Sequence, residues 1–220
     1  MKPRLLDLFC GAGGCAKGYQ RAGFYVVGVD INEQPNYCGD EFIQADALTF
    51  PLAGFDGYHA SPKCQMFSAY RRAMPDRGDE QYVNQIPEVR ERLKATGLPY
   101  VIENVPGAPL NGSVMLCGTG FGLDVQRHRL FESNVPIMSP GCAHGRNAAR
   151  FDRGSRHIRP NDRRTVAVGE WRIPLDVQQK AMGIDWMTVP ELSQAIPPAY
   201  TEHVGHYLML EVKRRQQVAA

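Results

Sequence analysis

The sequence Leu5-Leu6-Asp7-Leu8-Phe9-Cys10-Gly11-Ala12-Gly13-Gly14 changes from an apolar run to a run of small residues. An apolar run of this kind predicts a buried strand, and the amphipathic residues that follow, through Ala22, predict a helix. Because glycine has no Cβ, the backbone between them can approach a ligand closely. A buried strand that opens into a glycine turn is how an α/β fold begins a nucleotide-binding site, although the pattern also fits a tight structural connection.

Acidic residues accompany the next two apolar runs. Asp30 comes directly after the run 25–29 and lies 19 positions after Gly11. At the tip of a second strand, a carboxylate is placed to accept hydrogen bonds from ribose hydroxyls. Asp46 lies near the end of a predicted third strand, 42–48, where it can either bind an adenine amino group or cap a helix. The pattern therefore predicts a site for an adenosine-type ligand.

Length and composition limit the class of protein. A chain of 220 residues forms one substantial domain more readily than two. It contains no apolar run long enough to cross a bilayer, and its first residues lead directly into a strand, so we expect a soluble, cytoplasmic protein. The formal net charge of +2 does not by itself indicate nucleic-acid binding.

The chain has six cysteines, and no two of them form a CxxC pair. We therefore expect free thiols, with neither disulfides nor structural zinc. Cys117 lies in an apolar segment, 114–118, and is predicted to be an inert core residue. His144 and His157 are predicted to make polar contacts rather than to bind a metal, because neither has a second ligand at metal spacing. The cysteines are Cys10, Cys15, Cys38, Cys64, Cys117 and Cys142.

Two further predicted strands end in side chains that can take part in catalysis. The strand 55–60 runs into Ser61-Pro62-Lys63-Cys64-Gln65, in which the proline fixes a loop that carries a thiol. The strand 99–107 delivers Glu103 and Asn104. Because parallel strands present ligand-facing groups at their carboxyl ends, we expect Cys64 and Glu103 to share one crevice with the glycine turn.

Arginines are concentrated in two places. The predicted strand 125–133 places Arg127 and Arg129 on one face, which fits either a phosphate or base contact or a solvated edge. The segment 142–164 carries seven arginines against two aspartates, which is typical of phosphate binding and also fits a disordered, soluble loop. These seven are Arg146, Arg150, Arg153, Arg156, Arg159, Arg163 and Arg164.

The rest of the chain gives weaker signals. Charged, turn-forming residues over 70–82 predict a solvated loop. Helical spacing predicts helices over 87–96 and 174–182, and a last helix that begins at two prolines and continues through Val212. The segment 165–169 is predicted to be a strand.

Five motifs, in this order, resemble those of the cytosine-C5 methyltransferases. The likeness covers nearly the whole chain except 136–164, and the short recognition segment is most similar to phage-encoded members. It implies an α/β, Rossmann-like S-adenosylmethionine-dependent methyltransferase fold, with 1–135 and 165–220 as the catalytic domain and 136–164 as a basic recognition insertion. The motifs are Asp7 to Gly14, Ser61 to Gln65, Glu103 to Val105, Arg127 to Arg129, and Ser193 to Pro198 with Val204-Gly205.

The resemblance implies a function and a role for individual residues. Cys64 would add to C6 of a flipped cytosine in double-stranded DNA, Glu103 would hold the N3 side of the ring, and Arg129 with Arg127 would fix the base or the Glu103 carboxylate. The implied contacts to S-adenosylmethionine are Phe9, Gly11, Ala12, Gly13, Asp30, Ile31, Asp46, Ala47 and Gln194. The expected nucleic-acid contacts are Gln65, Ser68, Arg146, Arg150, Arg153 and Arg156. We expect a monomer that needs no metal or membrane.

Three positions depart from the family pattern. Lys63 stands where proline usually precedes the nucleophile, Gln194 stands where asparagine is common, and Gln126 lies one place nearer Arg127 than usual. Lys63 could point outwards, depress the pKa of Cys64, or pair with the carboxylate of carboxy-S-adenosylmethionine and so direct carboxymethyl transfer. The same motifs would also fit an enzyme that methylates cytosine in tRNA, or a catalytically silent DNA-binding module.

Overall fold

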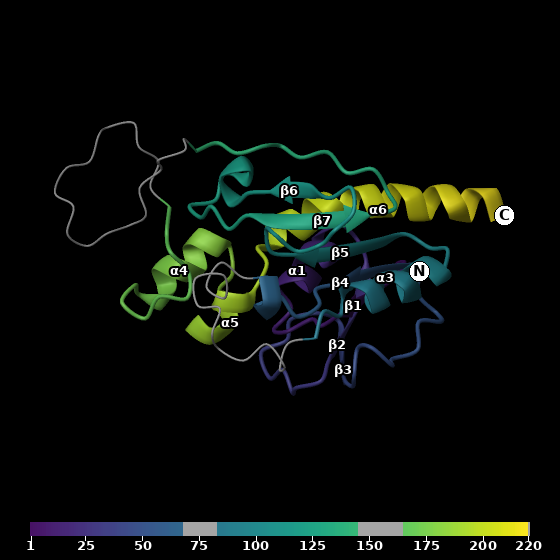
Figure 1. Ribbon diagram of the computed structural model, residues 1–220, viewed down its shortest axis with the longest axis horizontal. Helices are drawn as coiled ribbons and strands as arrows, with labels where there is room; N and C mark the ends of the chain where they lie inside the picture. Colours follow the sequence, from purple (N-terminus) through teal and green to yellow (C-terminus); the bar gives the residue numbers. More distant parts are fainter. Residues whose placement is uncertain (68–82, 145–164, 220) are drawn as a thin grey trace.

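The computed structural model describes residues 1–67, 83–144 and 165–219, which form a seven-stranded sheet with helices on both faces (Figure 1). The strand order is β3-β2-β1-β4-β5-β7-β6. Strands β1 to β5 run parallel, whereas β7 lies antiparallel between β5 and β6. The strands are β1 (Arg4–Leu8), β2 (Tyr25–Asp30), β3 (Glu41–Gln44), β4 (Gly57–Ala60), β5 (Tyr100–Asn104), β6 (Val114–Leu116) and β7 (Arg129–Ser133).

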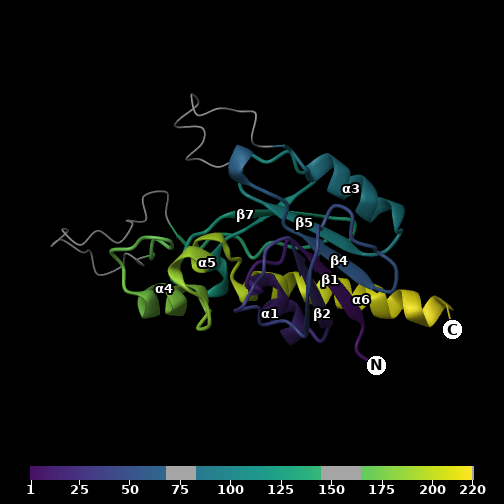
Figure 2. The same cartoon turned by 90° about the horizontal axis from the view of Figure 1, so that it is seen from below.

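Helices cover β1 and its neighbours on both faces, which explains why the β1 run is apolar without alternation. Figure 2 shows α1 and α6 on one face of the sheet and α3 on the other. Leu5, Leu6 and Leu8 are buried between these layers. The helices are α1 (Gly14–Arg21), α3 (Ile86–Ala95), α4 (Leu175–Met182), α5 (Val189–Gln194) and α6 (Pro198–Ala219), and the short 3₁₀ helices are η1 (Gln65–Phe67) and η3 (Gly118–Phe121).

The contact between α1 and α6 depends on a glycine. A Cβ on Gly18 would collide with Oγ1 of Thr201, so a larger residue would force the two helices apart. The hydroxyl of Thr201 instead donates to the carbonyl of Cys15 at 2.9 Å. This close packing brings the segment that leads into α6 next to the glycine turn that leads into α1.

Most elements match the sequence predictions, with shifted ends. The third strand ends at Gln44, because Asp46 starts a turn in which its Oδ1 accepts the N–H of Leu48 at 2.9 Å. The predicted strand over 165–169 is wrong: only Thr165 forms a strand-like bridge, and Gly169 has a left-handed φ of 93°. No helix in the described ranges is long and apolar enough to span a bilayer.

The proposed recognition insertion lies only partly within the described residues. Residues 136–144 return along β6, where the Ser139 hydroxyl donates to the carbonyl of Met115 at 2.7 Å. Residues 145–164 and the predicted loop 70–82 lie outside the described ranges. The division into a catalytic domain and an insertion stays a prediction.

Candidate active site

The glycine turn after β1 lies directly beside the end of β2. The N–H of Gly11 donates to Oδ2 of Asp30 at 3.1 Å, and the N–H of Asn32 donates to Oδ1 of the same carboxylate at 2.9 Å. Phe9, which opens the turn, has a left-handed φ of 61°, an unfavourable conformation for a non-glycine residue that clusters at functional sites. These bonds place Asp30 against the glycine turn, and its contact to a ribose stays a prediction.

The same region has room for an adenosine-type ligand. A Cβ on Gly11 would have no atom within 4 Å, so the turn faces open space. Ile31 follows Asp30 and is 59% exposed, although it is a large apolar residue. Each oxygen of Asp30 accepts one backbone N–H and keeps a second lone pair for a ribose hydroxyl. These residues fit a nucleoside that places its sugar on Asp30 and its base on Ile31.

The other residues that are predicted to contact the cofactor differ in their burial and in their hydrogen bonds. Asp46 is exposed and has the turn-forming bond described above, which is close to its predicted capping role. Ala47 is buried, and its carbonyl accepts a hydrogen bond from Arg92 at 2.7 Å. Ala12 and Gly13 are buried in the turn, and the Ala12 carbonyl accepts the indole N–H of Trp186 at 2.9 Å. Gln194 is exposed at the end of α5.

A thiol and a carboxyl group come together at the carboxyl ends of β4 and β5. Cys64 is half-buried in the loop after β4, and Glu103 is buried near the end of β5. Nε of Arg129, at the start of β7, lies 3.2 Å from Oε1 of Glu103. Burial, and secondly the charge of Glu103, raise the pKa of Cys64, and Arg129 opposes them. The charge of Glu103 is one of the causes that raise the pKa of Cys64, which agrees with the expectation that the two residues lie in one crevice.

Burial also raises the pKa of Glu103, although Arg129 and a hydrogen bond from Ser61 act against the shift. The raised pKa favours the protonated acid, which can donate a hydrogen bond as well as accept one. A half-buried thiol beside such an acid and a guanidinium can attack an electron-poor ring while the acid polarises that ring.

Arg127 has a different position from the one predicted. It precedes β7 and has a left-handed φ of 33°, so it does not share a strand face with Arg129. Its guanidinium donates to the carbonyls of Ala195 and Ser193, both at 2.7 Å. Burial, followed by the charge of Arg129, lowers the pKa of Arg127 to about 9. Neither a solvated edge nor a shared strand face describes this residue, which instead holds the segment between α5 and α6.

Sequence reasoning missed a buried chain of polar groups behind Glu103. The hydroxyl of Tyr19 lies 2.9 Å from Nδ1 of His59, whose Nε2 lies 2.9 Å from Oγ of Ser61. Ser61 in turn bonds Glu103. Burial lowers the pKa of His59 to about 3, so this ring is neutral. The available signal was a histidine inside an otherwise buried strand, two residues before the first residue of the nucleophile loop.

The loop that carries Cys64 is attached to β5 by an amide. Nδ2 of Asn104 donates to the carbonyl of Pro62 at 2.9 Å. Lys63 and Gln65 are both exposed, and the backbone N–H of Lys63 donates to Oε1 of Gln85 at 3.3 Å. The exposure of Lys63 agrees with the hypothesis that it points outwards. The remaining predicted nucleic-acid contacts, Ser68, Arg146, Arg150, Arg153 and Arg156, lie outside the described residues.

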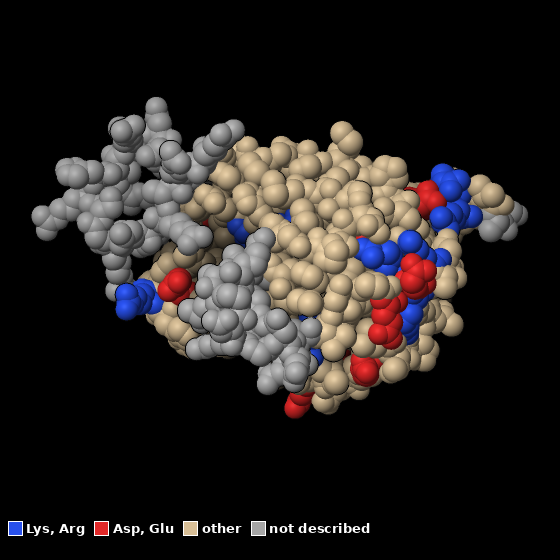
Figure 3. Space-filling model, viewed as in Figure 1, with Lys and Arg blue, Asp and Glu red and all other residues tan. Residues whose placement is uncertain are grey.

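Charged side chains are mixed on the molecular face that Figure 3 shows. Acidic and basic groups form pairs such as Glu91 with Lys94 on α3, and Glu211 with Arg214 and Arg215 on α6. The described residues on this face therefore do not form a continuous basic surface, and the arginine-rich segment stays the expected contact to phosphate.

Four side chains form a second cluster on the other side of β7. They are Cys117, His128, Cys142 and His144, and their ligand atoms lie within 4.8 Å of one another. The prediction for His144 rested on spacing in the sequence, whereas the fold brings together ligand atoms from residues that are distant in sequence. Cys117 is buried, as predicted.

Known proteins were compared with the chain. No protein-family model matches it. It is 29% identical over 161 residues to the type II methyltransferase M.AgeI of Thalassovita gelatinovora, a match that covers 60% of this chain and 37% of that protein. The chain thus spans little more than a third of that relative's length.

Solved structures resemble it over nearly its whole length. A chain described as a DNA modification methyltransferase encoded within an E. coli prophage has a TM-score of 0.67 and 15% identity, and the match covers 96% of this chain and 99% of that one. A Spodoptera frugiperda DNMT2 variant has a TM-score of 0.63 and 12% identity, covering 94% and 99%. The protein therefore has the Rossmann-like fold of these structures.

Proposed function

We propose that this protein is an S-adenosylmethionine-dependent methyltransferase that modifies C5 of cytosine in DNA through a covalent adduct at Cys64. The observation that carries the proposal is the position of a half-buried thiol beside the buried pair of Glu103 and Arg129, at the sheet edge that also holds the glycine turn. The names of the similar proteins, a type II methyltransferase and a DNA modification methyltransferase, support the reaction class and the substrate.

The donor site would be formed by the glycine turn and the end of β2. Asp30 would accept hydrogen bonds from the ribose, and Ile31 would pack against the adenine. S-adenosylmethionine, when bound, supplies an electrophilic methyl group. Arg127 would keep Gln194 near the donor by holding the carbonyls on either side of it.

The chain's own residues account for activation of the base. The Cys64 thiolate forms a bond to C6, and the electron pair released from the C5–C6 double bond makes C5 nucleophilic. Arg129 would orient Glu103 through their ion pair while the carboxyl group is ionised, and Glu103, once protonated, would donate to N3 and stabilise the adduct. After C5 has taken the methyl group it would lose its proton to water, N3 would return its proton to Glu103, and elimination would break the C6–S bond and free Cys64. The base must leave the stack for C6 to be reached.

The test is mass spectrometry of nucleosides from DNA that has been incubated with the protein and each of two donors, S-adenosylmethionine and carboxy-S-adenosylmethionine. We expect 5-methylcytosine with the first donor, and its loss in Cys64→Ser and Glu103→Gln. Carboxymethylcytosine from the second donor would instead assign a donor role to Lys63. A parallel reaction with tRNA tests whether RNA is the substrate.

A trapping experiment separates the enzyme from a silent binder. DNA that contains 5-fluorocytosine should form a covalent complex through Cys64 when donor is present, because fluorine at C5 blocks the elimination. Retention of DNA without an adduct would contradict the proposed activity and leave a binding module. An adduct on another cysteine would contradict the assignment of Cys64.

A further inference from the structure

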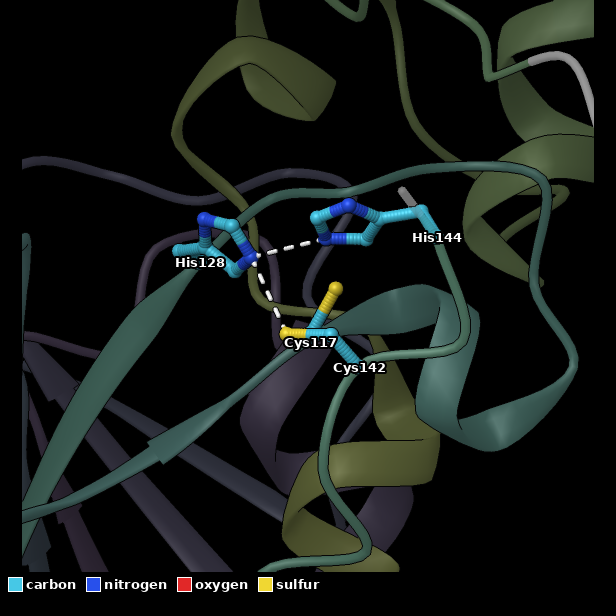
Figure 4. Close-up of side chains that lie close together, drawn as sticks. All are labelled: Cys117, His128, Cys142 and His144. Atoms are coloured by element: carbon cyan, nitrogen blue, oxygen red, sulfur yellow. Dashed lines mark hydrogen bonds between the residues drawn. The ribbon is translucent and has the colours of Figure 1, made fainter. Parts of the chain in front are cut away.

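The cluster of Cys117, His128, Cys142 and His144 lies outside the proposed active site. Figure 4 shows the two imidazole rings and the two sulfur atoms turned toward one another. The Nε2 atoms of His128 and His144 lie 3.1 Å apart, and Sγ of Cys142 lies 3.4 Å from Nε2 of His128. Two soft sulfur ligands and two imidazoles are the donor set of a closed structural zinc site.

The spacing of these atoms fits one metal ion. Tetrahedral zinc, with bonds of about 2.0 Å to nitrogen and 2.3 Å to sulfur, separates its ligand atoms by roughly 3.3 to 3.8 Å. The observed separations of 3.1 and 3.4 Å lie near that range, and no pair of ligand atoms exceeds 4.8 Å. Small rotations of the side chains would therefore bring all four into coordination.

The backbone holds the ligands in place from three directions. Cys117 follows β6, His128 precedes β7, and these two strands pair directly. The segment with Cys142 and His144 is attached through the N–H of Ala143, which donates to Oγ1 of Thr119 at 3.1 Å. The same segment is bound further back, where Nε2 of His203 on α6 lies 2.6 Å from the carbonyl of Met138. The site is thus preorganised by contacts that do not depend on residues 145–164.

A neighbouring hydroxyl completes the arrangement. Oγ1 of Thr119 lies 3.1 Å from Sγ of Cys117, where it can donate to a thiolate. Groups of this kind orient metal ligands and raise affinity.

We propose that Cys117, His128, Cys142 and His144 bind one zinc ion as a structural Cys₂His₂ site. Binding forms two Zn–S and two Zn–N bonds, and the two thiol protons pass to solvent, so the ion and the two thiolates balance in charge. Four protein ligands leave no open position, and the site is therefore structural rather than catalytic. It fastens the first residues of the arginine-rich segment to the strand that begins at Arg129.

The experiment measures metal bound to the full-length protein, without any need for activity. Protein purified without chelators is analysed for zinc by mass spectrometry, and its X-ray absorption spectrum is recorded at the zinc edge. We expect about one zinc per chain, with a first shell of two sulfurs and two nitrogens. Exchange with cobalt should give the absorption bands of tetrahedral, thiolate-bound cobalt.

Variants locate the site. Cys142→Ser and His128→Asn should lose at least about tenfold in zinc affinity, and Thr119→Val should lose about tenfold while all four ligands remain. Cys38→Ser and His206→Asn are matched controls outside the cluster and should retain full zinc content. Circular dichroism of each variant identifies any that fails to fold, and the wild-type absorption spectrum tests the proposal without them.

Three results would overturn the proposal. The first is wild-type protein with no zinc after expression in zinc-containing medium and no uptake of added zinc. The second is zinc that stays bound in both Cys117→Ser and Cys142→Ser. The third is a disulfide between these two cysteines in freshly purified protein, detected by non-reducing peptide mass spectrometry.

Discussion

At the scale of single residues, the charge of Glu103 affects the titration of Cys64. Burial and the Glu103 charge raise the pKa of the thiol, so alkylation of Cys64 should increase with pH and reach half its maximum above the ordinary thiol pKa. Glu103→Gln removes the second of these two causes. We expect Cys64 in this variant to react faster with iodoacetamide at about pH 8, while transfer to cytosine is lost.

Peptide mass spectrometry checks this prediction, because it separates Cys64 from the other thiols. Cys38 is a suitable internal reference: burial raises the pKa of its thiol to about 11, and the charges that modify this shift most are those of Lys17 and Asp7. Slower alkylation of Cys64 in Glu103→Gln would show that the carboxyl group does not act on the thiol as described.

Asp7 is a second residue whose charge is opposed by its surroundings. It is fully buried on β1, and neither carboxyl oxygen has a hydrogen-bond partner among the described residues. Burial, with the charges of Asp30 and Glu103, raises its pKa well above the usual range. A raised pKa in the folded state gives stability that is present at low pH and is lost as pH rises through the folded pKa.

Asp7→Asn should therefore stabilise the fold at about pH 8 and change little at about pH 4. The free energy of unfolding of the variant, relative to the wild type, rises by about 1.4 kcal/mol for each pH unit above the unfolded pKa of Asp7. The rise ends at the folded pKa or at the pH of the measurement, whichever is lower. Urea unfolding of both proteins at the two pH values measures the difference. Equal stability of the two proteins at the higher pH would mean that Asp7 is ionised at no cost.

At the scale of elements, Arg127 connects the entry to β7 with the segment between α5 and α6. Its planar guanidinium holds two carbonyls, those of Ala195 and Ser193, at once. The single ammonium of Arg127→Lys cannot reproduce this fork. A charge-assisted hydrogen bond contributes about 1.5 to 3 kcal/mol, so we expect the affinity for donor to fall roughly tenfold or more, with a smaller effect on kcat.

Two measurements test the role of Arg127. Calorimetry gives the donor affinity, and hydrogen exchange of residues 193–196 reports the local effect even if the donor is not the proposed one. Arg21→Lys is the control, because Arg21 forms an exposed pair with Glu202 away from this segment. Unchanged exchange in Arg127→Lys would contradict the positioning role.

The elements also show which features the sequence patterns could predict and which they could not. The glycine turn, Asp30 and the two strand ends with Cys64 and Glu103 could be predicted, because parallel strands deliver their carboxyl ends to one edge. Arg127 could not, since a left-handed turn before β7 breaks the alternation that the prediction assumed. The segment 165–169 has the apolar, β-branched residues of a strand, but of these five residues only Thr165 forms a strand-like bridge.

The Cys/His cluster escaped prediction for a different physical reason. Its ligands become neighbours only when β6 and β7 pair and the chain folds back from β7, so their spacing in sequence carries no metal signature. The chain Tyr19, His59 and Ser61 is similar, since α1 and β4 meet only in the folded sheet. Groups at the end of a single strand can be predicted from the sequence. Contacts between separate layers can be identified only in the folded structure.

At the scale of the whole molecule, the buried His59 makes the free energy of unfolding depend on pH in the acidic range. Its folded pKa of about 3 lies below the ordinary value of 6.5, so the unfolded chain binds a proton that the folded chain does not. The stability it contributes is complete above the unfolded pKa and is lost as pH falls toward 3. Between these limits its contribution to the free energy of unfolding should fall by about 1.4 kcal/mol per pH unit.

Urea unfolding of the wild type and of His59→Gln across this range isolates the contribution. Glutamine keeps hydrogen-bonding groups between Tyr19 and Ser61 but does not titrate, so the variant should be less stable near neutral pH and should lose less stability on acidification. Asp7 acts in the opposite direction over part of the same range, because its raised pKa favours the folded state as pH falls. The contribution of His59 is therefore measured by the difference between the two curves of unfolding free energy against pH, and not by either curve alone. Parallel curves would show that His59 is protonated in the folded protein and that the buried chain behind Glu103 carries a charge.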